Sequence, residues 1–295
     1  MKTWPFVSHA HSARFPREAV VFHWLLRGAV LGCFLGHGAF GILTKAEWLP
    51  FFEVFHVPEA LAWRIMPLVG AMDIVTGLVS FVWPCRIVLA WAVSWTLWTA
   101  LIRPMAGMSF LETIERAGNY GIPLALIMST TTTTSGLRAW LGRLEPRALT
   151  PALGRRLTFL LLCTTSLLLL GHGGFGVFLV KDLLVQHWAS IGLGLSNGIA
   201  FVRLVGTFEI VVALLVLVYP SRYLLIGIAA WKLFTESLYP IAGAPIFETI
   251  ERAGSYAAPL GALVVLAWVD RVRREKDLLR RPAAEGRCGN TASPP

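Results

Sequence analysis

The sequence predicts an all-α membrane protein of eight transmembrane helices, arranged as two parallel four-helix repeats with short interfacial helices on the non-cytoplasmic side. Three observations lead to this fold class. Hydrophobic residues make up 56% of the 295-residue chain and charged residues only 15%, whereas a soluble domain carries roughly 25% charged residues. Apolar runs such as 157–170 and 202–219 contain almost no charge, and a spanning helix needs about 20 mainly apolar residues. Short motifs in the first half of the chain recur in the second half.

The recurrence is regular enough to indicate a tandem duplication. The sequence Gly-His-Gly-Ala-Phe-Gly at 36–41 returns as Gly-His-Gly-Gly-Phe-Gly at 171–176. The block Glu-Thr-Ile-Glu-Arg at 112–116 returns unchanged at 248–252. Such internal repeats decide the architecture of a chain, so they take precedence over local patterns.

Each half contains four apolar segments of spanning length. We expect spans at 24–43, 66–83, 87–103 and 119–137, and again at 157–178, 202–219, 223–240 and 255–270. Because four is even, both halves enter the membrane from the same side and form parallel repeats. The predicted organisation is an N-terminal segment 1–21, a first repeat 22–138, a basic linker 139–156, a second repeat 157–270 and a basic tail 271–295.

Basic residues set the expected orientation. Most of the 26 Lys and Arg residues fall in the N-terminal segment, the linker, the tail and two tight turns on one predicted side. Positive residues favour the cytoplasmic side, so we expect a multi-pass protein of the cell inner membrane with both termini in the cytoplasm. The net charge of +9 then reflects orientation, and we expect a lipid bilayer, not nucleic acid, as the partner.

Charged residues that occur in both halves gather at the predicted outer ends of the spans. Glu112 and Arg116 are four apart and can pair on one helix face, with Glu115 one residue off that face. Two interpretations stay open: the charges only fix a turn, or they line a pocket for an anionic or quinone-like head group. The candidate ligand-binding residues are Lys45, Glu115, Arg116, Lys181, Glu251 and Arg252.

Each charged block is followed by residues typical of a turn. Gly118 and Gly254 fit the left-handed end of a helix, and Asn119 and Ser255 are good N-caps for the next one. The sequence therefore predicts a short interfacial helix, a sharp turn and the start of the last span.

Ionisable residues also lie inside the predicted spans, where they are functional candidates by default. Lys232 and Glu236 are one helical turn apart, while the first half has Thr96 and Ala100 at the matching positions. A self-neutralising pair of this kind fits an architectural role as well as a functional one, and both readings remain open. The intramembrane ionisable residues are His37, Asp73, His172, Glu209, Lys232 and Glu236.

His37 and His172 occupy matching Gly-His-Gly contexts. Two imidazoles on facing helices could ligate a haem or a metal. Close helix packing with a hydrogen-bonded histidine is the favoured explanation, so no metal site is assigned. The chain contains no nucleotide-binding loop, nucleophile triad or zinc pattern, and no catalytic residue is assigned.

Several of these motifs together resemble the DoxX-like family of four-helix membrane proteins. The similar features are His-Gly in the first helix followed by Lys, Gly-x-x-acid in the second helix (Gly70–Asp73 and Gly206–Glu209), and a short turn with Arg. The resemblance implies small inner-membrane proteins, some linked to sulfur oxidation and quinone reduction.

Three functional hypotheses follow. The first is a redox-associated subunit that binds a quinone or a small anionic molecule in a non-cytoplasmic pocket, together with a membrane redox partner. The second is a proton-coupled transporter of small molecules. The third is a non-catalytic membrane assembly protein.

Overall fold

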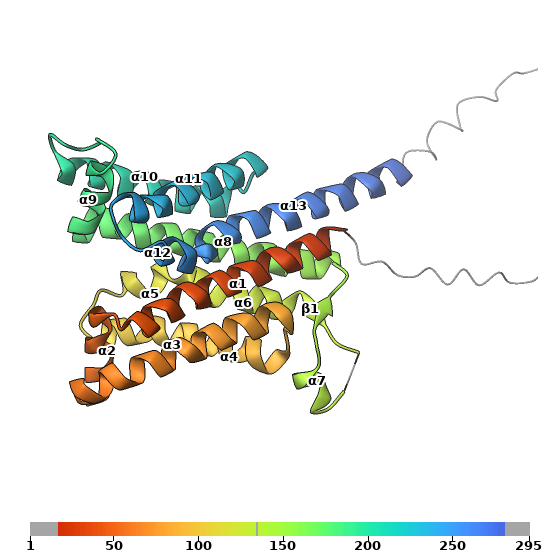
Figure 1. The fold of residues 1–295 in the computed structure, drawn as a ribbon. Coiled ribbons are helices and arrows are strands. Elements are labelled where there is room, and N and C mark those ends of the chain that lie inside the picture. The colour runs from red at the N-terminus through yellow and green to blue at the C-terminus, as the bar shows by residue number, and fades with distance from the viewer. Residues whose placement is uncertain (1–16, 134, 281–295) are drawn as a thin grey trace, which may run out of the picture.

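The protein is almost entirely helical in a computed structural model that describes residues 17–133 and 135–280 (Figure 1). Most of the predicted N-terminal segment and the end of the basic tail lie outside the described residues. Among the described residues, seven helical segments are long and apolar enough to cross a membrane. The chain is therefore a multi-pass membrane protein. The longer helices are α1 (Arg17–Leu43), α3 (Glu59–Val82), α4 (Arg86–Met105), α6 (Ala117–Met128), α8 (Pro151–Gly174), α10 (Gly198–Val218), α11 (Arg222–Ile241) and α13 (Ala253–Arg280).

Short helices lie between the long ones, as predicted for the loops. Four of them, together with a 3-10 turn at Ala46–Trp48, gather at one end of the bundle, and α1 begins and α13 ends at the opposite end (Figure 1). The four are α2 (Leu49–Glu53), α5 (Leu111–Glu115), α9 (Asp182–Ala189) and α12 (Phe247–Glu251). Helix α8 continues into a π-helical turn at Phe175–Leu179.

Four helices form the centre of the molecule. Helices α1, α6, α8 and α13 pack against one another, while α3 and α4 lie on one side of them and α10 and α11 on the other (Figure 1). Leu26, Ile122, Leu161 and Ala258, one from each central helix, are all buried in a single core cluster. The two halves of the chain thus share one core.

The outer helices expose apolar side chains. Leu68 of α3 is 70% exposed and Val218 of α10 is 84% exposed. Large apolar patches on a protein surface need an apolar neighbour, and the hydrocarbon core of a bilayer supplies it.

The fourth predicted span, 119–137, is too long. Helix α6 ends at Met128, where the hydroxyls of Ser129 and Thr130 donate to the carbonyls of Leu126 and Ile127, 3.0 Å away in both cases. The chain then forms a two-residue strand β1 (Thr130–Thr131), which pairs antiparallel with β2 (Glu145–Pro146) beside helix α7 (Arg138–Leu141). Hydroxyl side chains compete for backbone hydrogen bonds in this way, so the threonine run ends the helix early.

The glycines next to the two histidines let helices cross closely. A Cβ at Gly38 would lie 2.7 Å from the carbonyl oxygen of Gly70, and a Cβ at Gly173 would lie 2.6 Å from that of Gly206. Small residues at a crossing allow such backbone contact between membrane helices. This is the favoured interpretation of the Gly-His-Gly motifs.

Candidate functional site

A cavity of about 600 Å³ opens where the short helices gather. All six residues that we selected as ligand-binding candidates line it. They come from the loops after α1 and α8 and from the two Glu-Thr-Ile-Glu-Arg blocks, which form α5 and α12 with the arginine that follows each. The structure therefore brings together Lys45, Glu115, Arg116, Lys181, Glu251 and Arg252.

Each arginine holds both acids of its own block. Arg116 Nη1 donates to Glu112 Oε2 at 2.9 Å and to Glu115 Oε2 at 2.7 Å. Arg252 Nη1 makes the same two bonds, at 2.6 Å to Glu248 and 3.1 Å to Glu251. The predicted pairing four residues apart is present. The second acid was expected to lie off that face, but α5 and α12 end just before the arginine, which lets the guanidinium reach it.

Each lysine crosses to the other half of the chain. Lys45 Nζ donates to Glu248 Oε1 at 2.6 Å, and Lys181 Nζ forms the equivalent hydrogen bond with Glu112. The lysines also lie over the rings of Phe40 and Phe175, with Nζ 4.1 and 3.7 Å from the ring centroids. Charge-assisted bonds of this kind are stronger than neutral ones, so they tie the two halves together at the cavity.

Glycines at the joint let the charged blocks approach the central helices. A Cβ at Gly36 would lie 2.5 Å from the backbone nitrogen of Glu251, and a Cβ at Gly171 would collide with that of Glu115 in the same way. The first helix of each half thus packs against the second acid of the other half.

The turn predicted after each block is wrong in its details. Gly118 and Gly254 are not left-handed helix ends, because α6 and α13 begin at Ala117 and Ala253 and include them. They contact each other where α6 and α13 pack together, and a Cβ at Gly118 would lie 2.9 Å from the carbonyl carbon of Gly254. Asn119 and Ser255 accordingly lie within the first helical turn and not at its cap.

The electrostatics of the cavity keep Glu115 ionised. Burial alone would raise its pKa, but the charges of Arg116 and Arg252 outweigh burial and lower the pKa to about 2. Burial would likewise lower the pKa of Arg116, yet Glu115 and Glu112 raise it. An opposite charge within a few ångströms stabilises the charged form of both partners. At neutral pH this part of the cavity is a set of fixed charges.

The two intramembrane histidines each bind a carboxylate of the neighbouring helix. His37 Nδ1 lies 2.9 Å from Asp73 Oδ2, and His172 Nδ1 lies 2.6 Å from Glu209 Oε2. These contacts join α1 to α3 and α8 to α10. His37 lines the cavity and His172 does not, so the cavity gives the haem hypothesis no support.

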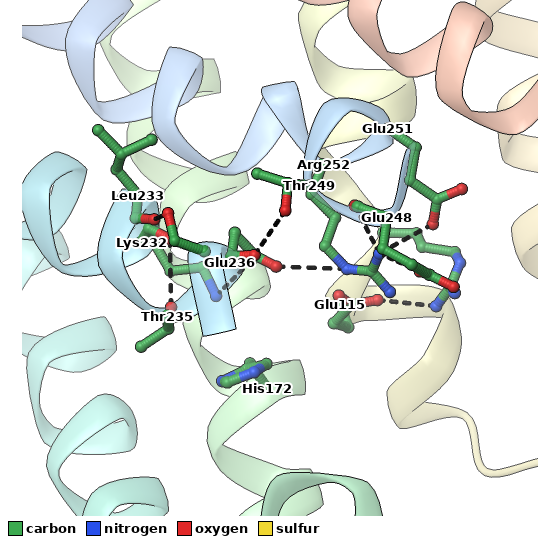
Figure 2. Close-up of polar contacts among 12 residues, drawn as sticks. Glu115, His172, Lys232, Leu233, Thr235, Glu236, Glu248, Thr249, Glu251 and Arg252 are labelled. Carbon is green, nitrogen blue, oxygen red and sulfur yellow. Dashed lines mark hydrogen bonds and ion pairs between the residues drawn. The ribbon is translucent and has the colours of Figure 1, made fainter. Parts of the chain in front are cut away.

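Lys232 and Glu236 form a buried ion pair, with Nζ 2.8 Å from Oε1 and side chains only 2% and 1% exposed. Arg252 Nε lies 3.3 Å from the other Glu236 oxygen, which connects the pair to the cavity (Figure 2). Thr249 Oγ1 donates to the Glu236 carbonyl at 2.8 Å, and Figure 2 draws this contact as well. Two cations share one acid, so the pair is part of a larger charged network.

Sequence reasoning missed Arg103 and Tyr239, which also line the cavity. Arg103 Nη1 lies 3.6 Å from Glu112 Oε2, and the guanidinium of Arg252 lies 4.0 Å from the ring centroid of Tyr239. The two residues are 136 positions apart in the sequence. Their matching places at the ends of α4 and α11 were the available signal.

An aromatic slot of about 300 Å³ adjoins the cavity. The two spaces share four lining residues: His37, Trp48, Phe51 and Arg103. The remaining walls of the slot are mainly aromatic and aliphatic side chains of the first half: Phe52, Phe55, Val57, Ile65, Val69, Trp95, Trp98, Thr99 and Ile102. A third space of about 10 Å³ lies next to Asp73 and Trp95.

Comparison with known proteins finds no matching family model, no matching curated protein and no matching solved structure. No group of three or more His, Cys, Asp or Glu side chains arranged to hold a metal ion occurs in the described part of the chain. What stands is a multi-pass membrane protein with a charged cavity and an adjoining aromatic slot.

Proposed function

We propose that the protein binds a small amphipathic molecule, with its polar end in the charged cavity and its flat apolar part in the aromatic slot. The observation that carries this proposal is that charged side chains from both halves line one cavity, which shares His37 and Arg103 with the slot. Ligand sites typically enclose roughly 300–1,000 Å³ with apolar walls and a few convergent polar groups. Both spaces fall within that range.

The charge balance narrows the class of ligand. The cavity is lined by five Lys and Arg side chains and by five glutamates: Lys45, Arg103, Arg116, Lys181, Arg252, Glu47, Glu112, Glu115, Glu248 and Glu251. All five of these cations are already within ion-pair distance of an acid. A neutral polar group, such as a carbonyl oxygen of a quinone, fits this lining better than a small anion does.

We also propose the repeat architecture and the membrane orientation of the chain. Matched histidine–acid, lysine–glutamate and arginine–glutamate contacts in the two halves support two parallel repeats of a DoxX-like unit. The distribution of basic residues supports an inner-membrane protein with both termini in the cytoplasm. In that setting the ligand serves a redox-associated subunit with a membrane partner.

The test is mass spectrometry of small molecules retained by the gently purified protein, followed by the same measurement on Glu115→Gln and Lys45→Ala. We expect a quinone-like compound in the native protein and much less of it in both variants, with unchanged size-exclusion profiles. If folded variants retain as much ligand as the native protein, the cavity is not the site. A native protein free of small molecules points to the assembly role.

Proton-coupled transport is the second candidate, favoured by one observation. Lys232, Glu236 and Arg252 form a buried chain of charges that leads from the cavity into the membrane-spanning helices. Intramembrane ionisable chains are typical of proton pathways. Uptake of the retained compound into proteoliposomes should then require a proton gradient and fail in Glu236→Gln; uptake that is indifferent to both rules this function out.

A further inference from the structure

In the first half of the molecule, one ring nitrogen of His37 is available to a ligand. His37 Nδ1 is engaged by Asp73, and Nε2 takes part in none of the described hydrogen bonds. The imidazole stacks on Trp48 with ring centroids 4.6 Å apart, and both residues line the cavity and the slot. Its side chain is 21% exposed. The ring therefore stands where the polar and the aromatic spaces meet.

Polar groups beside this histidine lack partners. Asp73 is fully buried, its Oδ1 has no hydrogen-bond partner, and Trp95 Nε1 has none either. Both residues line the 10 Å³ space, which also borders His37. Leaving buried polar atoms unpaired costs about 1–3 kcal/mol each. The site is thus polar and incomplete on its protein side, as expected where a further polar group binds.

At the matching place in the second half, both oxygens of the acid are bonded, although Nε2 of His172 also takes part in none of the described hydrogen bonds. Glu209 is one methylene longer than Asp73 and bonds both His172 and Trp231, whose Nε1 donates to Oε1 at 2.8 Å. The ring of Trp188 packs on those of Trp231, Phe201 and Phe234, with centroids 5.3 to 6.0 Å apart. His172 is only 9% exposed. The aromatic rings of the second half thus pack against one another at this place.

We infer that the chain binds one ligand, with a flat oxygen-substituted ring in the slot of the first half and one ring oxygen hydrogen-bonded to His37 Nε2. This inference rests on the proposed function and deepens it. The aromatic walls favour a flat ring, because aromatic side chains stack on such a partner. The single imidazole at the mouth then selects a ring that carries a carbonyl or hydroxyl oxygen.

The histidine–aspartate pair suits both kinds of oxygen. An ionised Asp73 accepts a hydrogen bond from Nδ1–H, which leaves Nε2 of a neutral imidazole as an acceptor for a ligand hydroxyl. When Nε2 carries a hydrogen, it donates to a ligand carbonyl instead. The same contact therefore holds a ring dione or a ring diol.

The test measures binding of a radiolabelled benzoquinone with a ten-carbon alkyl chain to the full-length protein in phosphatidylcholine nanodiscs. Decylbenzene, which lacks the oxygens, is the matched probe. We expect the native protein to bind the quinone at least about tenfold more tightly than decylbenzene. The loss of one hydrogen bond in a buried site weakens binding by about tenfold. Equal binding of the two probes overturns the inference.

The variants place the contact. His37→Phe keeps a flat ring beside Trp48 but removes the nitrogens, so quinone binding should weaken about tenfold. The matched His172→Phe should change it less than about twofold. Val69→Phe, which fills the slot and leaves His37 in place, should also weaken binding. Unfolding temperatures identify any variant that fails to fold. If only one of His37→Phe and Val69→Phe folds, its binding decides whether the ring lies in the slot.

The outcomes separate this inference from the proposed function. If His37→Phe and Val69→Phe bind normally while Lys45→Ala binds weakly, the cavity stands and the assignment to His37 fails. An equal loss in His37→Phe and His172→Phe also overturns the choice of the first half. If Lys45→Ala and Glu115→Gln bind normally as well, the proposed function itself fails.

Discussion

The two halves of the chain are most alike where they meet and least alike in their interiors. At the joint, each arginine binds the two acids of its block and each lysine crosses to the opposite block, with the same partners in both directions. In the interior, the first half has an aromatic slot beside His37, whereas the second half has a packed aromatic cluster beside Glu209 and a buried Lys232–Glu236 pair. Shared residues thus hold the halves together, and different residues give each interior its own chemistry.

One exchange of residues illustrates the contrast. In the first half the guanidinium of Arg103 lies 5.0 Å from the ring centroid of Phe51. At the positions 136 residues later, His187 and Tyr239 pack edge to face with centroids 4.3 Å apart. The contact is kept while the cation is replaced by a phenol. The first half therefore has the positive charge of Arg103 at the slot, and the second half has the buried imidazole of His187 at the matching place.

The largest expected effect concerns the charged pair that only the second half contains. Glu236→Gln should lower the free energy of unfolding by about 3–5 kcal/mol, because it leaves Lys232 and Arg252 facing each other without the acid between them. The double variant Lys232→Thr, Glu236→Ala restores the residue types of the first half and should cost less than the single one. Thermal unfolding in detergent measures both. If the double variant is the less stable of the two, the pair is a net source of stability and this account of it is wrong.

The sequence predicted the joint better than the interior, for physical reasons. In the blocks at 112–116 and 248–252, the spacing of four residues alone predicts the pairing of the first glutamate with the arginine. The charges repeated in both halves were expected at one end of the molecule. The slot follows from the packing of Trp95, Trp98 and Phe51, side chains whose distances no periodicity records. The early end of α6 depends on two hydroxyl hydrogen bonds and a strand pairing; the run of hydroxyl residues after Met128 is a sequence signal for the first, and the pairing with Glu145–Pro146 has none.

The second prediction tests whether the joint is as symmetric as its contacts. Gly36→Ala and Gly171→Ala should each cost about 1–3 kcal/mol, because the new methyl group collides with the backbone of the opposite acid and the helices must separate. Gly28→Ala is the control on the same helix as Gly36, since nothing lies within 4 Å of a Cβ there. It should be neutral or stabilising by up to about 1 kcal/mol. A clearly larger loss at one joint glycine than at the other would contradict a symmetric joint.

The third prediction exchanges the two acids behind the histidines. Glu209→Asp should cost about 1–2 kcal/mol, because the shorter side chain cannot hold both His172 and Trp231. Asp73→Glu should change stability by less than about 1 kcal/mol, since the longer side chain gains Trp95 but crowds a packed site. Chemical unfolding in detergent gives both values. Equal losses in the two variants would mean that the difference of one methylene does not explain why only Glu209 has both oxygens bonded.

The smallest expected effect is a dependence on pH that belongs to His187 of α9. Burial, followed by the charge of Arg252, lowers the pKa of His187 to about 4. At pH values between about 4 and the usual pKa of histidine, the unfolded chain binds a proton at His187 and the folded protein does not. The free energy of unfolding therefore falls as the pH falls. Between pH 7.5 and 5.5 the loss should be about 1 kcal/mol. Glu115, with its pKa near 2, stays ionised over this window and adds nothing to the change.

The matched variant is His187→Phe, which places in the second half the residue type that Phe51 supplies in the first. Other histidines titrate in the same window, so the quantity to compare is the difference between native protein and variant at each pH. That difference should shift in favour of the variant by about 1 kcal/mol as the pH is lowered from 7.5 to 5.5. A constant difference would mean that His187 takes up its proton in the folded state, and that the ring beside Tyr239 is open to solvent instead of sealed by it.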